Sequence, residues 1–168
     1  MKKLIPVFTA VLMMVVFATT VKAQVTGTAT GTASIITPIA IANAGNMNFG
    51  NIAVSATAGT VVLTPAGTRS KTGGVTLPAV TGTVSAAAFT VTGLGSSTYS
   101  ITLPTTYTIT SGANNMTLGT FTSTPSGTGT LSSGTQTVNV GATLNVAASQ
   151  AAGAYTNATG FPVTVNYN

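Results

Sequence analysis

"FPVTVNYN", residues 161–168, places a large apolar or aromatic side chain at every second position. These side chains are Phe161, Val163, Val165 and Tyr167. Successive side chains of a β-strand point to opposite faces of a sheet, so this period indicates a strand with one buried face. A C-terminal strand is therefore expected over these residues.

Comparable strands are expected through most of the preceding sequence. Threonine, valine and isoleucine favour extended structure, and glycine and asparagine mark the turns between strands. No stretch after residue 23 keeps a helical apolar period over several turns. The segments expected as strands are 47–52, 60–64, 75–80, 83–93, 99–104, 107–110, 115–123, 129–140, 142–148 and 161–167, with a turn over 66–74. Short strands at this spacing predict an all-β fold, an antiparallel β-sandwich of about seven to nine strands.

The first 23 residues have the organisation of a signal peptide. Lys2 and Lys3 precede an apolar stretch, and Val21 and Ala23 have the small-residue spacing of a signal-peptidase site. Cleavage is expected between Ala23 and Gln24. A retained transmembrane helix is the alternative, but the apolar stretch ends in two threonines just before the cleavage pattern. The sequence thus predicts export without a retained transmembrane segment, to the periplasm, the outer surface or the extracellular space.

The chain carries 5 Lys and Arg residues and no Asp or Glu, for a formal net charge of +5. The lysines of the predicted signal peptide leave with it, so the mature chain keeps only Arg69 and Lys71. Binding to nucleic acid needs a patch of basic side chains, so no nucleic-acid partner is expected. The predicted organisation is a signal peptide over 1–23, a Gly/Thr N-terminal extension over 24–32 and a single β-sandwich domain over 33–168.

The chain contains no Asp, Glu, His or Cys. It therefore lacks the usual groups for general acid–base catalysis, the usual bases that activate a serine, and almost all side chains that bind zinc or calcium. Lys71 could form a dyad with a serine, but the glycines and polar residues around it offer nothing to desolvate its amine. The sequence predicts no enzyme activity, no catalytic residue, no cofactor, no metal site and no disulfide.

Five segments together resemble one bacterial family. They are ITPIAIANAGNMNFGNIAV (36–54), VVLTPAGTRSKTGGVTL (61–77), FTSTPSGTGTL (121–131), VGATLNVAASQAAGAY (140–155) and FPVTVNYN (161–168). In this order they are similar to the secreted domain of unknown function 4402, over residues 33–168. The resemblance implies a secreted location and brings no assigned enzyme activity.

A second resemblance is to subunits of chaperone–usher pili, especially the archaic type, and to the spore-coat-U-like domains. It rests on NFGNI (48–52), YSITL (99–103) and the penultimate Tyr167. This resemblance implies an immunoglobulin-like or pilin-like sandwich that assembles with other subunits. It also makes a periplasmic chaperone a candidate partner.

VTGTATGTASII, residues 25–36, alternates small or apolar side chains with hydroxyls. In donor-strand assembly, a segment of this kind fills a groove in the next subunit. The candidate donor contacts are Val25, Ala29, Ala33 and Ile35. The strand at 161–167 is the expected neighbour of the donor. Two alternatives stay open: an edge strand of its own domain, which Pro38 would fit, and a flexible Gly/Thr leader. In each case residues 39–41 are expected in the home sheet.

The sequence predicts a structural subunit of the bacterial surface, fimbrial or otherwise self-associating, whose partners are copies of itself or related subunits. Natural edge strands commonly carry charge that discourages pairing between molecules, and residues 25–36 carry none.

The main alternative is a cell-surface module, an adhesin, that binds carbohydrate or another protein. Its candidate ligand contacts are Arg69, Lys71, Tyr99 and Tyr107. A solvated hairpin loop around the two cations, and core packing of the two tyrosines, are the simpler interpretations. An ice-binding protein is less favoured, because the Thr-x-Thr pairs recur at irregular intervals and a solenoid needs a fixed repeat.

Overall fold

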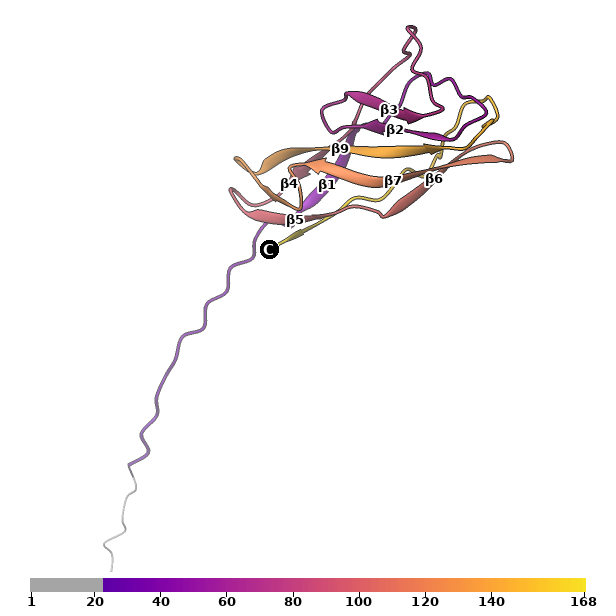
Figure 1. Cartoon of the computed structure of the whole chain (residues 1–168). Helices are drawn as coiled ribbons and strands as arrows, with labels where there is room; N and C mark the ends of the chain where they lie inside the picture. Colours follow the sequence, from indigo (N-terminus) through magenta and orange to yellow (C-terminus); the bar gives the residue numbers. More distant parts are fainter. Residues whose placement is uncertain (1–22) are drawn as a thin grey trace, which may run out of the picture. The chain divides into compact units, whose positions relative to one another are not determined.

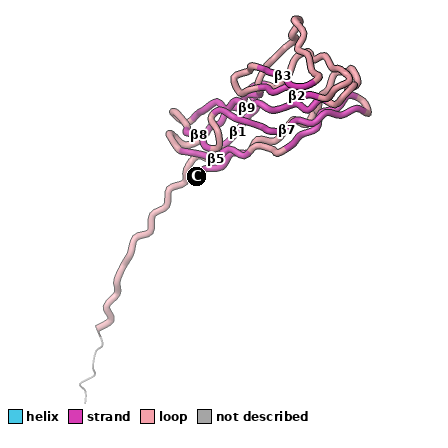
Figure 2. Tube along the Cα trace, in the orientation of Figure 1, coloured by secondary structure: helices cyan, strands magenta, loops and turns pink. Residues whose placement is uncertain are grey.

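The computed structural model describes residues 23–168. The predicted signal peptide, apart from Ala23, lies outside the described residues. The chain divides into two units, Met1–Ser34 and Ile35–Asn168, and each is considered by itself. Residues 23–168 contain no helix, and every strand belongs to the second unit (Figure 2).

Ten strands make up the second unit, and all of their pairings are antiparallel. They are β1 (Ala40–Gly45), β2 (Gly59–Leu63), β3 (Arg69–Gly73), β4 (Ala87–Thr92), β5 (Thr98–Thr102), β6 (Thr106–Ser111), β7 (Asn114–Thr124), β8 (Thr128–Thr130), β9 (Thr135–Val146) and β10 (Thr164–Tyr167). The predicted all-β class is confirmed, and the two sheets that these strands form are consistent with a β-sandwich.

β9 organises the larger sheet, in which seven strands take part. One edge of β9 pairs first with β4 and then with β2, so that Val140 lies opposite Ala87 and Ala142 lies opposite Leu63. The other edge of β9 pairs with β7, and β6 pairs with β7 in turn. Figure 1 shows β3, β2, β9, β7 and β6 following one another across this sheet.

Gly141 stands on β9 at the point where β2 ends and β4 begins along the shared edge. A Cβ atom at this position would lie 2.7 Å from the carbonyl carbon of Thr64 and 2.8 Å from the nitrogen of Pro65, and closer still to the carbonyl oxygen of Leu63. The backbone that leaves β2 therefore passes β9 at a distance that only glycine permits.

The smaller sheet has three strands in the order β10-β5-β8. Val165 of β10 lies opposite Ile101 of β5, and Tyr99 of β5 lies opposite Gly129 of β8. Its inward side chains pack against those of β4 and the first half of β9. The smaller sheet is thus the second layer over one part of the larger sheet.

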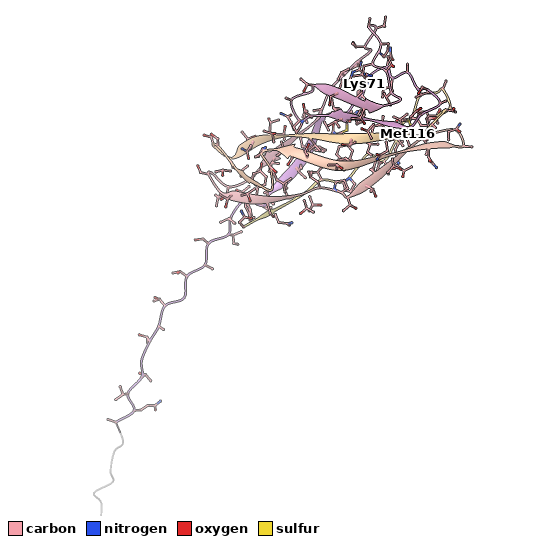
Figure 3. All side chains as sticks on the ribbon, viewed as in Figure 1. Lys71 and Met116 are labelled. Carbon is pink, nitrogen blue, oxygen red and sulfur yellow. The ribbon has the colours of Figure 1, made fainter. Side chains whose placement is uncertain are left out.

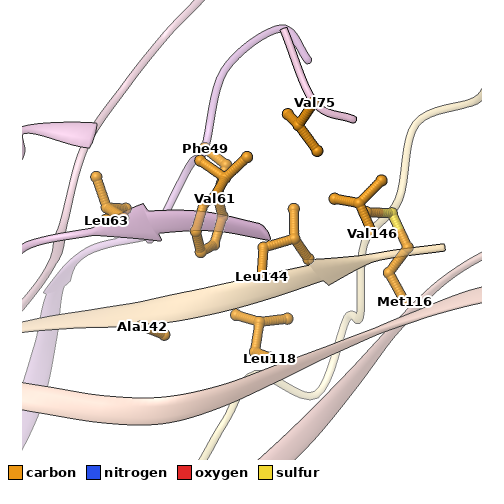
Figure 4. Close-up of a cluster of buried hydrophobic side chains, with 9 residues drawn as sticks. All are labelled: Phe49, Val61, Leu63, Val75, Met116, Leu118, Ala142, Leu144 and Val146. Carbon is orange, nitrogen blue, oxygen red and sulfur yellow. The ribbon is translucent and has the colours of Figure 1, made fainter. Parts of the chain in front are cut away.

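The core consists of two clusters that β9 joins. The inward side chains of β9 are Val138, Val140, Ala142, Leu144 and Val146, all buried. The Tyr99 cluster contains Ala87, Phe89, Val91, Tyr99, Ile101, Leu131, Val138, Val140 and Val165. The Phe49 cluster contains Phe49, Val61, Leu63, Val75, Met116, Leu118, Ala142, Leu144 and Val146 (Figure 4). β5 and β10 contribute side chains only to the Tyr99 cluster, and β8 contributes none to either cluster, so the smaller sheet leaves the Phe49 cluster without a second layer of strands.

Five of the expected segments are wrong in detail. Residues 47–52 form only an isolated bridge, from Asn48 to Ser85, and residues 129–140 are divided between β8 and β9. Residues 66–74 were expected to form a turn, yet β3 begins at Arg69 and pairs with β2 throughout. An edge strand such as β3 is held by backbone hydrogen bonds to one neighbouring strand and can form without an apolar face. Its polar residues therefore resemble a turn in the sequence. Residues 75–80 form only an isolated bridge, from Thr76 to Ala53. Residues 142–148, expected as a separate strand, largely continue β9 through Gly141. Residues 23–168 form ten strands, where about seven to nine were expected.

Candidate functional site

The N-terminal segment is described from Ala23 onward and forms no strand or helix before β1. Val25 is 91% exposed and Ile35 is 102% exposed, and Ala29 and Ala33 are also exposed. The expected edge strand over 25–36 is therefore not present as a strand in this structure. Ile41 lies in β1, as expected, and Ile39 directly precedes this strand and packs against the Tyr99 cluster.

The C-terminal strand β10 has one paired edge and one unpaired edge. Asn168 N–H donates to the Thr98 carbonyl, 3.3 Å away, on the side of β5. Backbone groups alternate in direction along an antiparallel strand, so the N–H and C=O groups of Val165 and Tyr167 point to the opposite edge. In residues 23–168 no strand pairs with that edge. β10 therefore has an open edge in the sense that no strand is hydrogen-bonded to it, while β1 lies close to β10.

The strand predicted over 161–167 is shorter in the structure, since β10 begins at Thr164. Pro162 has no N–H to donate to a ladder, which accounts for the late start. Phe161 and Val163 nevertheless keep the inward alternation, because both are half-buried and pack against the Tyr99 cluster. Val165 and Tyr167 lie in β10 itself.

Phe161 is held by three aromatic neighbours. Its ring centroid lies 6.1 Å from that of Phe89 and 6.0 Å from that of Tyr107, both in edge-on geometry, and 5.1 Å from that of Phe121. Edge-on pairs at these distances contribute about 0.5–1.5 kcal/mol each beyond burial of their area. The chain that precedes β10 is thus fixed against the larger sheet.

A groove of about 1230 Å³ opens beside Phe161. Its floor is formed by side chains of β6, β7 and β9, and its sides are segments 43–54 and 150–161. The floor side chains are Tyr107, Ile109, Met116, Leu118 and Leu144. Three of them, Met116, Leu118 and Leu144, belong to the Phe49 cluster (Figures 3 and 4).

The structure separates the two tyrosines that were candidate ligand contacts. Tyr99 is fully buried in the core, and its hydroxyl donates to Oε1 of Gln136, 2.6 Å away. Desolvation by this burial raises the pKa of Tyr99 above its ordinary value. Tyr107 is half-buried on β6 beside the groove, and its hydroxyl is buried without a hydrogen-bond partner.

Arg69 and Lys71 are the cations among residues 23–168, and they lie on β3, at the opposite edge of the larger sheet from β6. The Arg69 guanidinium donates to the carbonyl oxygens of Phe49, Asn51 and Thr81. Its hydrogen bonds therefore hold two loops of the chain together. Lys71 is exposed at the edge of the sheet (Figure 3). The structure does not bring Arg69 or Lys71 together with Tyr99 or Tyr107.

Tyr167 makes contacts that sequence analysis did not predict. Its hydroxyl accepts a hydrogen bond from Leu94 N–H at 2.7 Å and donates to the Thr37 carbonyl at 2.9 Å. It therefore ties β10 to the chain entering β1 and to the loop after β4. The penultimate position of Tyr167 was noted in the sequence, but alternation alone cannot indicate the partners of a side-chain hydroxyl. The sides of the groove were also missed, because segments 43–54 and 150–161 meet only in the folded chain.

No helix within residues 23–168 is long and apolar enough to cross a membrane. The same residues contain no group of three His, Cys, Asp or Glu side chains that could hold a metal ion. The groups present at the open edge and the groove are backbone amides, hydroxyls, the side-chain amides of asparagine and glutamine, and apolar side chains. Such groups can bind an extended peptide by hydrogen bonding and burial of apolar surface.

The model of a family described as "Domain of unknown function (DUF4402)" matches residues 39–167. No curated protein and no solved structure matches the chain. The family predicted from the five sequence segments is confirmed, and the likeness to chaperone–usher pilins stays a prediction.

Proposed function

Because this chain belongs to the family described as "Domain of unknown function (DUF4402)", whose description assigns no activity, we propose a function from the geometry of the open strand edge. The protein is a secreted structural subunit of the bacterial surface, fimbrial or otherwise self-associating. It associates with further copies of itself by β-strand addition, in which residues 25–36 of one copy are the added strand. It has no enzymatic role in this proposal.

The unpaired edge of β10 is the observation that carries this proposal. An open edge presents a row of unpaired N–H and C=O groups and is a template for pairing with another chain. Charged side chains commonly blunt such edges in nature, and residues 161–168 carry none. The chain before β1 supplies a segment with the matching properties, since residues 25–36 are uncharged and alternate in side-chain character.

The exposed side chains of this segment supply part of the free energy of association. Val25 is 91% exposed and Ile35 is 102% exposed. Full burial of each side chain would contribute about 1.5–3 kcal/mol. Backbone pairing would add about 0.5–1.5 kcal/mol for each hydrogen bond. Residues 25–36 reach about 40 Å when extended at about 3.3 Å per residue, enough to cross a sandwich.

The binding-module alternative has less support from the geometry. Of its four candidate contacts, Tyr99 is buried and Arg69 donates to backbone carbonyls within the chain. Lys71 is exposed and Tyr107 is half-buried, but they lie at opposite edges of the larger sheet, on β3 and β6. These side chains do not form one surface. A related surface subunit, or a periplasmic chaperone that covers the same edge, is a further candidate partner.

A pair of matched variants tests the proposal. Ala29→Asp with Ala33→Asp places two carboxylates on the side of the segment that would face the partner, and we expect it to abolish oligomers. Burial of a carboxylate without a partner is strongly unfavourable. Thr28→Asp with Thr32→Asp adds the same charge at the intervening positions, and we expect its oligomers to persist. Sizing of both variants by chromatography and on unboiled gels gives the readout. Normal oligomers from the alanine variant would refute the proposal.

A further inference from the structure

The first side of the groove beside Phe161, segment 43–54, is fixed to the body of the domain. Backbone hydrogen bonds join Asn48 to Ser85 in both directions, at 2.8 and 3.0 Å. The Arg69 guanidinium donates to two carbonyl oxygens of the same segment. This side of the groove is therefore formed before a ligand binds, which lowers the entropy cost of binding.

The opposite side, segment 150–161, is fixed to β6. Thr156 and Thr110 exchange backbone hydrogen bonds of 2.9 Å. Nδ2 of Asn157 donates to the Thr108 carbonyl, 3.0 Å away. Because both sides are held by hydrogen bonds within the chain, the groove of about 1230 Å³ between them is preformed, as ligand sites usually are.

Three asparagine side chains on the first side have free hydrogen-bonding groups. Asn43, Asn46 and Asn48 line the groove and are exposed. The side-chain amides of Asn43 and Asn46 make no hydrogen bond within residues 23–168, and Asn48 uses only its Oδ1, which accepts from Gly50 N–H at 2.8 Å. Each amide carries two N–H donors and a carbonyl acceptor side by side. Together they give this side of the groove several unused donors and acceptors.

The opposite side and the floor add an acceptor and aromatic rings. Gln150 donates through Nε2 to the Asn115 carbonyl and to the Tyr155 hydroxyl, and its Oε1 has no partner among the described residues. The rings of Tyr107, Tyr155 and Phe161 line the groove and are half-buried. The face of an aromatic ring carries partial negative charge, so it attracts the weakly positive C–H groups of a sugar ring.

The chemistry of the lining favours a neutral sugar chain. No charged side chain lines the groove, so a charged ligand would lose hydration there without gaining an ion pair. Free amide donors and acceptors suit the adjacent hydroxyls of a sugar, whereas β-strand addition needs a row of backbone groups. The volume of about 1230 Å³ exceeds the range of about 300–1,000 Å³ that is typical for small-molecule pockets, so several linked sugar rings fit better than one.

We propose that this groove binds a neutral oligosaccharide. Asn43, Asn46 and Asn48 hydrogen-bond to sugar hydroxyls from one side, and Gln150 accepts a hydrogen bond from the other. The ring of Tyr155 packs against the face of a sugar. The site gives the protein a second role, attachment to an uncharged polysaccharide.

This site is independent of the proposed self-association. Its lining includes no residue of the segment 25–36 and none of β10. It also differs from the ligand site expected from the sequence, because Tyr107 is the one of those four candidate contacts that lines the groove. Either proposal can therefore fail without the other.

Calorimetric titration tests the ligand class. The protein that begins at Gln24 is titrated with neutral hexasaccharides built from glucose, galactose, mannose or N-acetylglucosamine. We expect at least one of them to bind, with an affinity that added salt leaves unchanged, since no charge pairs across the site. Failure of the whole set to bind would overturn the proposal. Binding only of a sialylated or uronic-acid oligosaccharide, or only of an uncharged Gly/Thr peptide, would also overturn it.

Matched asparagine variants test the contacts. Asn43→Ala and Asn46→Ala remove amides that make no hydrogen bond in the described part of the chain, so we expect both variants to keep the Tm of the unchanged protein. Loss of the hydrogen bonds to sugar should weaken binding about threefold to tenfold in each. Asn114→Ala, at an exposed asparagine of β7 outside the groove, should bind normally. Equal affinity of all three variants would overturn the site.

A spin label locates the bound sugar, because the chain contains no cysteine of its own. A nitroxide on Ala154→Cys, at an exposed position on the side of the groove, should broaden the NMR lines of the bound hexasaccharide. The same label on Ser70→Cys, on exposed β3, should not. Broadening from Ser70→Cys alone would overturn the groove as the site. The titration is repeated with Ala29→Asp and Ala33→Asp combined, and unchanged sugar binding there separates this site from self-association.

Discussion

Replacement of Gly141 by alanine should destabilise the sandwich strongly, because β9 has no room for a side chain where β2 leaves it. A Cβ atom would lie 2.7 Å from the Thr64 carbonyl carbon and 2.8 Å from the Pro65 nitrogen. Both are backbone atoms, so no side chain can rotate away to relieve the clash. β9 cannot shift either, since Val140 and Ala142 pair with β4 and β2 on either side.

The magnitude follows from this geometry. Overpacking a well-packed core by one methyl group typically costs about 1–3 kcal/mol. At Gly141 the clash is with backbone atoms, at the point where the β2 ladder ends and the β4 ladder begins. We therefore expect a cost of about 3 kcal/mol, the top of this range. At about 4 °C per kcal/mol for a domain of this size, the Tm should fall by about 12 °C.

Gly119 on β7 is the matched control. A Cβ atom at Gly119 would meet the Thr105 carbonyl oxygen at 3.8 Å and Nδ2 of Asn145 at 3.9 Å, which are ordinary contacts. Its replacement by alanine should stabilise the domain by about 0.4–1 kcal/mol, because alanine restricts the unfolded chain. Both variants are measured by thermal and urea denaturation at two protein concentrations, since association would make the Tm depend on concentration. Equal stability of Gly141→Ala and Gly119→Ala would refute the close passage of β2 and β9.

Two further predictions concern Tyr99 and Arg69. Because burial raises the pKa of Tyr99 above 10.0, the folded state keeps the hydroxyl proton to higher pH than the unfolded state, and stability should fall as pH rises above about 10. The urea midpoint of Tyr99→Phe should fall less steeply over the same pH range. Parallel pH profiles for the unchanged protein and Tyr99→Phe would contradict this. Arg69→Met removes the hydrogen bonds to Phe49, Asn51 and Thr81 and should cost about 1–2 kcal/mol, allowing for solvent at this partly exposed group. Lys71→Met, on the same exposed strand, should change the free energy of unfolding by less than about 0.5 kcal/mol. A larger loss of stability in Lys71→Met than in Arg69→Met would contradict the role of Arg69 in holding the two loops together.

The apolar alternation in the sequence predicted the strands with a buried face. β2, β4, β5 and β10 all fall where alternate apolar residues stood, because burial of one face is itself the source of that pattern. β3 was missed because its residues, RSKTG, gain their hydrogen bonds from β2 and bury little. A strand of this kind leaves no apolar period in the sequence.

The candidate site was predicted only in part. Alternation placed Val165 and Tyr167 on a C-terminal strand, where the structure has them. Alternation could not indicate which edge of that strand is unpaired, because its pairing partner, β5, lies far away in the sequence. The groove depends on segments about a hundred residues apart in sequence, and no local pattern records that they face each other.

The two tyrosines also show that alternation in the sequence does not predict how exposed a side chain is. Tyr99 and Tyr107 both stand in alternating strands of similar composition. Tyr99 is buried because it lies on the central strand of the smaller sheet, opposite Gly129, where a side chain would collide with its ring. Tyr107 lies on β6 at the edge of the larger sheet, beside the groove. Their different exposure is a property of the sheet order.

Self-association through the N-terminal segment is tested most directly by comparing the protein that begins at Gln24 with one that begins at Ile35. Both are sized by chromatography and on unboiled gels at equal concentration. We expect a ladder of oligomers from the longer protein and a folded monomer from the shorter one. Two monomers, or two identical ladders, would contradict it.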